Sequence, residues 1–305
     1  MSSLSNAPNA SAVRQQPKFS VAITTTGSKN LINNTLGDPE RAKRFVASIT
    51  SAVAVNPALQ ECEAGSILAG ALLGESLNLS PSPQLGQYYL VPFKSKAKYD
   101  RLGNLIQPET TKAQFVLGYK GYIQLALRSG AYADLDVMEI REGEYKGKNP
   151  NTGKPMFSFV EDDDERERLP VVGYMAYFEY LNGFRKTIYW SKSKMMNHAD
   201  TYSPAYSAAA HQKIMAGEIA DKDMWRYSSF WYKDFDGMAK KTLLRQLISK
   251  WGVMSTEMQA AYANDGTMSE VGASNEIVTT PEENLMLAQP EAETVVEQID
   301  LSDLQ

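Results

Sequence analysis

Cysteine and histidine are almost absent from this chain of 305 residues. Cys62 is the one cysteine, so no disulfide can form within the chain, which fits a reducing cytoplasm. With only His198 and His211 beside it, it cannot supply the ligand set of a common structural zinc site. We therefore expect neither a disulfide framework nor a metal site.

Long apolar runs are also missing. No stretch of about 18 apolar residues is present, so we expect no membrane-spanning helix and no membrane partner. Residues 1–20 lack the apolar segment of a secretory signal, which favours a cytoplasmic protein. A hydrophobic content of 43% is nevertheless ample for one large domain or two small ones.

Motifs for nucleotide and metal chemistry are lacking too. The nearest match to a phosphate-binding loop, residues 147–155, has five residues between its glycines instead of four, and Pro155 replaces the magnesium-binding Ser or Thr. The acidic run 161–165 lies in one charged segment, whereas a two-metal nuclease site needs carboxylates from separate rigid elements. We expect no cofactor, no catalytic residue and no enzyme. A magnesium-dependent DNA nuclease stays the alternative.

Positive charge is missing from one end of the chain. Residues 265–305 contain ten acidic residues and no lysine or arginine, although the whole chain has a net charge of only −5. The 31 basic residues all lie in residues 1–264, against the 26 remaining acidic ones, so this part has a net charge of +5. We predict a disordered acidic tail over 265–305, which either docks a partner or competes with DNA by mimicking its phosphates.

The remaining patterns predict an α+β fold, with antiparallel hairpins packed against several helices. Residues 1–35, rich in Ser, Asn, Ala and Thr, are expected to form a flexible arm before a single core over 36–264. Predicted helices cover 39–55, 63–77 and 119–130, and predicted strands cover 87–93, 112–118 and 134–142. A hairpin over 171–190 turns at Asn182-Gly183, which predicts that Leu181 pairs with Phe184 and Glu179 with Lys186.

The stretch 227–254 combines aromatic residues with ordered cations. Apolar residues recur at spacings of three and four from Phe235 to Trp251, which predicts a helix with one buried face. Lys241 and Arg245 stand four apart on another face, about 6 Å along the axis, so they could follow successive phosphates. A core helix with a solvated cationic face explains the same pattern.

A second cationic line lies in the predicted helix 119–130. Lys120, Gln124 and Arg128 recur every four residues opposite an apolar stripe. A basic loop over 94–101 joins the two preceding strands and could act as a finger on a phosphate backbone. Both features are also compatible with ordinary solvated surface.

Three separated segments resemble the RecT family of phage-type single-strand annealing proteins. They are YYLVPFK at 88–94, LGYKGYIQLALRSG at 117–130 and DGMAKKTLLRQLISKWG at 236–252, and the resemblance covers about residues 35–255. It implies a protein that binds single-stranded DNA without ATP, forms rings or helical filaments, and anneals complementary strands into a duplex. It also implies a phage or prophage protein in a bacterial host, with a RecE-type exonuclease and a host single-strand-binding protein as partners.

We predict that neighbouring subunits form a continuous basic groove for the DNA backbone. The candidate DNA-binding residues are Lys94, Lys96, Lys112, Lys120, Arg128, Arg185, Lys186, Lys240, Lys241 and Arg245. Tyr122, Phe230 and Trp231 either stack on bases or belong to the core. A structural assembly protein that ignores DNA is a further alternative.

Overall fold

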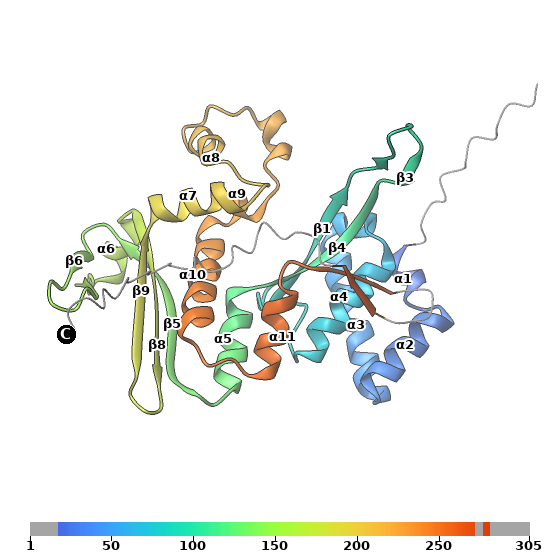
Figure 1. The fold of residues 1–305 in the computed structure, drawn as a ribbon, viewed down its shortest axis with the longest axis horizontal. Coiled ribbons are helices and arrows are strands. Elements are labelled where there is room, and N and C mark those ends of the chain that lie inside the picture. The colour runs from blue at the N-terminus through green and yellow to red at the C-terminus, as the bar shows by residue number, and fades with distance from the viewer. Residues whose placement is uncertain (1–17, 272–276, 281–305) are drawn as a thin grey trace, which may run out of the picture. The chain divides into compact units, whose positions relative to one another are not determined.

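The computed structural model describes residues 18–271 and 277–280 and confirms an α+β fold with antiparallel sheets (Figure 1). The rest of the predicted arm and tail, residues 1–17, 272–276 and 281–305, lies outside this description. The described residues divide into two compact units, where we had predicted one core. The first unit holds 18–73, 90–114, 269–271 and 277–278, and the second holds 74–89, 115–268 and 279–280.

Helices dominate the first unit. They are α1 (Phe19–Ala22), α2 (Thr26–Leu36), α3 (Pro39–Val55), the 3-10 helix η1 (Pro57–Glu61) and α4 (Ala64–Ser76), whose last residues belong to the second unit. The predicted helix 39–55 is confirmed, with Asp38 accepting a hydrogen bond from the Glu40 N–H and Pro39 at the first position.

The prediction of a flexible arm is wrong for residues 18–35, which form α1 and most of α2. The Thr25 side chain caps α2, and Phe19 and Ile32 are 3% and 1% exposed. Apolar residues are sparse in this segment, but those present are buried, which is enough to hold two short helices in the core.

Four strands form a sheet in the order β1-β4-β10-β11. They are β1 (Tyr88–Ser95), β4 (Thr110–Leu117), β10 (Met268–Val271) and β11 (Ile277–Thr280), and a small antiparallel hairpin of β2 (Lys98–Tyr99) and β3 (Leu105–Gln107) lies between β1 and β4 in the chain. The predicted strands 87–93 and 112–118 are confirmed. The predicted disordered tail starts too early, because residues 265–271 are ordered and β10 pairs within this sheet.

The second unit is built on the antiparallel sheet β5-β8-β9. Its strands are β5 (Tyr132–Arg141), β8 (Val171–Tyr180) and β9 (Arg185–Ser191). Helix α10 (Phe235–Trp251) packs against all three strands and also against α5 (Tyr119–Arg128), which in turn contacts α11 (Thr256–Asn264) (Figure 1). Helix α10 is thus enclosed between a sheet and helices, so most of its circumference is buried.

Shorter elements complete the second unit. They are β6 (Tyr145–Lys148), β7 (Pro155–Phe157), α6 (Asp163–Arg168), α7 (Lys192–Tyr202), α8 (Ala208–Met215), the 3-10 helix η2 (Asp221–Arg226) and α9 (Phe230–Lys233). No helix within 18–271 or 277–280 is both long and apolar enough to cross a membrane.

The hairpin between β8 and β9 exists, but its predicted register is wrong by one residue. Glu179 lies opposite Arg185, and Phe178 lies opposite Lys186. The Tyr180 N–H donates to the Phe184 carbonyl, and Gly183 has a φ of 82°. The loop therefore has three residues, with a glycine in the left-handed region, in place of a two-residue turn. A slip of one residue moves Lys186 to the opposite face of the sheet.

Two glycines allow the start of α5 to approach another part of the backbone. The Gly118 N–H donates to the Gln87 carbonyl at 2.8 Å. A Cβ on Gly118 would overlap the carbonyl oxygen of Gly86, and a Cβ on Gly121 would overlap that of Gln87. The glycines of the segment LGYKG thus fix how closely α5 lies against residues 86–87.

We expect Gly121→Ala to destabilise the protein by about 2 kcal/mol, because the new methyl group meets a backbone carbonyl that cannot rotate away. Gly65→Ala in α4 is the matched control, since its methyl group would have ordinary contacts at 3.6–4.0 Å. The control should be neutral or slightly stabilising. Urea unfolding measures both, and equal midpoints for the two variants would refute this account of the glycine.

Candidate functional site

Helix α10 directs neighbouring cations into two different carboxylate clusters of the second unit. Lys240 and Lys241 are adjacent in the chain and therefore about 100° apart around the helix axis. Lys241 and Arg245, four residues apart, lie on the same face. Lys240 pairs with Glu139 on β5, while Lys241 and Arg245 both pair with Asp265, just after α11.

Asp265 is fully buried and accepts four hydrogen bonds. Its oxygens lie 2.8 Å from Lys241 Nζ, 3.0 Å from an Arg245 Nη atom, 3.1 Å from the Tyr122 hydroxyl and 2.9 Å from the Leu117 backbone nitrogen. A carboxylate without solvent is tolerated only when it is paired and hydrogen-bonded in this way. We call these residues the Asp265 cluster.

Burial and the charge of Asp265 shift the pKa of Lys241 in opposite directions and that of Tyr122 in the same direction. Burial lowers the pKa of the Lys241 ammonium, while Asp265 raises it, and burial prevails. Burial and then Asp265 raise the pKa of Tyr122 well above its usual range, so its hydroxyl stays protonated and can donate to the carboxylate. Arg245 also lies 3.7 Å from the centre of the Tyr262 ring, a cation–π contact.

The predicted placement of Lys241 and Arg245 on an open face of the helix is wrong. They are 9% and 8% exposed, whereas Trp251, predicted for the buried face, is 47% exposed. The Asp234 side chain caps the start of the helix by accepting from the Gly237 N–H. The recurrence of apolar residues every three and four positions identified the helix. The carboxylate that pairs with its two buried cations, Asp265, lies outside the stretch 227–254.

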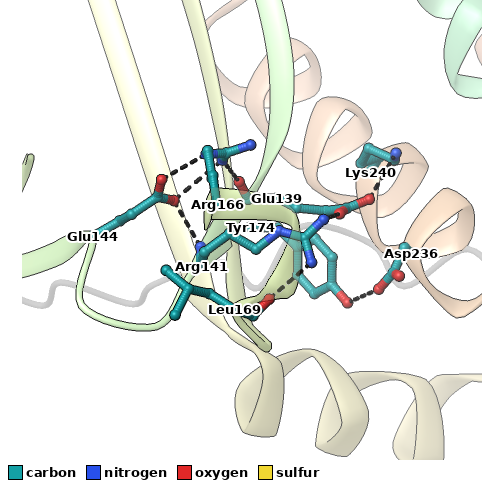
Figure 2. Close-up of polar contacts among 8 residues, drawn as sticks. All are labelled: Glu139, Arg141, Glu144, Arg166, Leu169, Tyr174, Asp236 and Lys240. Carbon is teal, nitrogen blue, oxygen red and sulfur yellow. Dashed lines mark hydrogen bonds and ion pairs between the residues drawn. The ribbon is translucent and has the colours of Figure 1, made fainter. Parts of the chain in front are cut away.

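The second cluster joins β5 to α6 and α10 (Figure 2). Glu139 lies 3.1 Å from Lys240 and 3.0 Å from Arg141. Glu144, fully buried, lies 2.6 Å from Arg166 and accepts from the Arg141 N–H at 2.7 Å. The acidic run that we weighed as a nuclease site therefore begins a short helix whose arginine holds a buried glutamate.

An aromatic–cationic surface lies at the start of α5, and it consists of Tyr89, Tyr119, Lys120, Phe230 and Lys240. The Tyr89 and Phe230 ring centres are 5.5 Å apart, and Lys240 Nζ lies 5.2 Å from the centre of the Tyr119 ring. The three rings are partly exposed and Lys120 is exposed. A Cβ on Gly86 would lie 3.0 Å from the Tyr89 hydroxyl and 3.5 Å from Lys120 Cδ, so these two side chains lie close together. Burial, then Asp234 and Tyr119, raise the pKa of Tyr89.

Sequence reasoning missed two members of this surface. Tyr89 lies in a predicted strand and Tyr119 begins a predicted helix, so both were assigned to structure alone. Of the three aromatics considered for base stacking, Tyr122 and Trp231 are core residues at 0% and 5% exposure, and Phe230 is partly exposed. One signal was available in the sequence. Tyr119 stands between a glycine and a lysine in the segment LGYKG, and Tyr89 lies in the strand predicted to pair with the strand that leads into this segment.

The predicted site residues of the first unit differ in exposure. Lys94 is exposed and lies 2.7 Å from Glu109 across the hairpin. Lys96 is exposed, and Lys112 on β4 is partly buried. These cations are on or beside the β1–β4 hairpin, as expected.

The remaining predicted residues of the second unit already have partners. Arg128 is exposed but donates to two backbone carbonyls that follow α4, at 2.8 and 3.5 Å. Arg185 pairs with Glu179 at 2.9 Å. Lys186 lies 3.7 Å from the centre of the Trp251 ring. Among the described residues of this unit, Lys120 is the predicted DNA-binding cation that is exposed and makes neither an ion pair nor, unlike Arg128, a hydrogen bond to the backbone.

Within the part of the chain that the structure covers, no three His, Cys, Asp or Glu side chains are placed to hold a metal ion. Residues 147–155 form the end of strand β6, the turn after it and the first residue of β7, with Gly147 and Gly153 at φ values of 92° and 65°.

Comparison with known proteins matches the model of the RecT family to residues 43–279. An uncharacterized protein, YqaK of Bacillus subtilis (strain 168), is 36% identical over 239 residues, covering 78% of this chain and 69% of that protein. Protein RecT of Escherichia coli (strain K12) is 33% identical over 224 residues, covering 73% of this chain and 71% of that protein. The family match includes all three segments that carry the resemblance and every candidate DNA-binding residue.

We expect Asp265→Asn to lower the free energy of unfolding by about 3–5 kcal/mol, because it leaves Lys241 and Arg245 buried without a counter-charge. Glu40→Gln is the control, since its pair with Lys43 is exposed on both sides and is expected to contribute less than about 1 kcal/mol. Both are measured by urea unfolding. An effect of Asp265→Asn as small as that of the control would contradict a structural role for the cluster.

Acid should weaken the fold partly through Glu144. Burial raises its pKa, but hydrogen bonds from Arg166 and from the Arg141 and Val160 amides lower it more, so it lies below the ordinary 4.5. The ionised carboxylate then stabilises the fold above about pH 4.5, and this contribution is lost as the pH falls through the lower folded-state pKa.

The stability advantage of the parent over Glu144→Gln should therefore be constant near neutral pH and shrink below about pH 4.5. The neighbouring Glu142→Gln, at an exposed position, should follow the parent at every pH. Urea midpoints measured from pH 7 to pH 3.5 test this, and an advantage that grows on acidification would overturn it.

Proposed function

This chain belongs to the RecT family, and from that premise we propose that it binds single-stranded DNA and anneals complementary strands without ATP. Family membership supports a single-strand annealing role in recombination. The observation that carries the proposal is the match over residues 43–279, together with the aromatic–cationic surface within it.

The aromatic–cationic surface has the chemistry that single strands require. Partly exposed Tyr89, Tyr119 and Phe230 offer ring faces for stacking, which every base can use regardless of sequence. Lys120 beside them offers a cation to a phosphate. Contacts of this kind hold the backbone and one base face, and they leave the base-pairing edges available to a second strand.

Annealing on such a surface needs no nucleotide hydrolysis. Base pairing of the incoming strand supplies the free energy, and the protein supplies alignment and screens the repulsion between two phosphate chains. A duplex product is held mainly through its backbone, since the surface reads no sequence. The protein is therefore proposed as an annealing protein and not as an enzyme.

We infer that the cations divide into two roles. The exposed Lys94, Lys96, Lys120, Arg128 and Arg185 meet phosphates directly. The partly or fully buried Lys112, Lys186, Lys240, Lys241 and Arg245 do not belong to this exposed set, and the last three make ion pairs within the second unit.

Assembly extends this surface. The aromatic–cationic surface of one subunit has one exposed cation, Lys120, so we propose that subunits associate in a ring or helical filament whose cationic surfaces form a continuous groove. A RecE-type exonuclease that produces single strands and a host single-strand-binding protein are the proposed partners, in the cytoplasm of a bacterial host of a phage or prophage.

Annealing of two complementary labelled oligonucleotides without ATP tests the proposal. The parent should accelerate annealing and leave both strands intact with and without magnesium. Degradation that requires magnesium would establish the nuclease alternative, and oligomers that leave annealing unchanged would establish an assembly protein.

Lys120→Ala should weaken binding to single-stranded DNA and reduce the slope of log affinity against log salt by about 0.7, the value of one lost phosphate contact. Lys213→Ala, an exposed cation on α8 outside the proposed site, is the control and should keep the parent's slope. Binding titrations at several salt concentrations measure both. Equal slopes for the parent and Lys120→Ala would remove this residue from the interface.

A further inference from the structure

A cavity of about 60 Å³ lies in the second unit beside the Asp265 cluster. Its walls come from α7, α9, α10 and the residues after α11, and include Ser203, Trp231, Lys241, Arg245 and Asp265. A water molecule needs about 10–15 Å³ of such space, so the cavity has room for a small polyatomic ion.

Two buried polar atoms of residues in this wall have no protein partner. Ser203 is 4% exposed and Arg245 is 8% exposed. Among the described residues, nothing hydrogen-bonds to the Ser203 hydroxyl or to Arg245 Nε. Leaving such a group unsatisfied costs about 1–3 kcal/mol, so native structures normally provide a partner.

The wall also has more positive than negative charge. Lys241 and Arg245 face one carboxylate, Asp265, whose oxygens already accept from four donors. An ammonium has three donor hydrogens and a guanidinium five. Asp265 takes one hydrogen bond from Lys241 and one from Arg245, and Arg245 donates a second hydrogen bond to the Tyr122 hydroxyl, so donor capacity remains in the wall.

We propose that this cavity binds a phosphate group, held by Ser203, Arg245 and Lys241. A tetrahedral oxyanion accepts hydrogen bonds from several directions at once, and its charge balances the second cation of the cluster. Asp265 holds Lys241 and Arg245 in place, so the site is organised before the anion arrives. The phosphate belongs either to the backbone of bound DNA or to a free anion, and only the first source rests on the proposed function.

Ser203→Ala separates this role from a structural one, because Ser203 is not part of the Asp265 cluster. Removing an unsatisfied buried hydroxyl should leave the fold as stable as the parent or slightly more stable. Thr201→Ala is the matched control at the end of the same helix, since its exposed hydroxyl bonds only to the Asn197 carbonyl.

The first arm measures thermal midpoints in inorganic phosphate and in chloride at equal ionic strength. If the site exists, phosphate should raise the thermal midpoint of the parent and of Thr201→Ala more than that of Ser203→Ala, because ligand binding stabilises the folded state. General salting effects of phosphate act equally on all three proteins. An identical rise in all three would show that the cavity holds water only and would overturn the proposal.

The second arm identifies the source of the phosphate. If Ser203→Ala also lowers the affinity for a single-stranded oligonucleotide several-fold while Thr201→Ala does not, the site takes a backbone phosphate. If only the response to inorganic phosphate changes, the site takes a free anion. A parent protein that responds to phosphate but does not anneal DNA would refute the proposed function and leave the phosphate site standing.

Discussion

The ionic cluster around Asp265 sets the arrangement of the second unit. One buried carboxylate receives donors from the end of β4, from α5 and from α10, at Leu117, Tyr122, Lys241 and Arg245. It thereby fixes which face of α10 turns toward α5, and it makes the residues after α11 part of the core. Because a buried carboxylate and buried cations are each costly alone, the three elements are stable in this arrangement only together.

This constraint decides which cations of the second unit are available to DNA. With Lys241 and Arg245 drawn inward and Lys240 paired to Glu139, helix α10 has little charge left for an open groove. The start of α5 takes that role in our account, with Lys120 exposed beside partly exposed aromatic rings. The glycines at 118 and 121 matter for the same reason, since they set how α5 lies against residues 86–87, next to Tyr89.

Local patterns predicted the elements well, and the reasons for failure are specific. Asp38-Pro39 fixed the start of α3, and apolar spacing located α5 and α10, because these signals act within a few residues. The burial of Lys241 was not predictable, since its partner lies 24 residues further on in a segment that composition assigns to an acidic tail. The β8–β9 register failed because Asn-Gly serves both two- and three-residue loops, and the ordering of 18–35 rests on a few buried side chains such as Phe19 and Ile32.

Lysine modification followed by mass spectrometry, with and without single-stranded DNA, distinguishes the start of α5 from α10 as the DNA-binding surface. We expect Lys96 and Lys120 to react in the free protein and to be protected by DNA. Lys241, whose side chain is 11% exposed beside Asp265, should react poorly in both states. Lys213 should react equally in both states. The contradicting result is strong modification of Lys241 in the free protein, protection of Lys241 by DNA, and no protection of Lys120. It would show that the Asp265 cluster opens and that α10 itself is the DNA-binding surface.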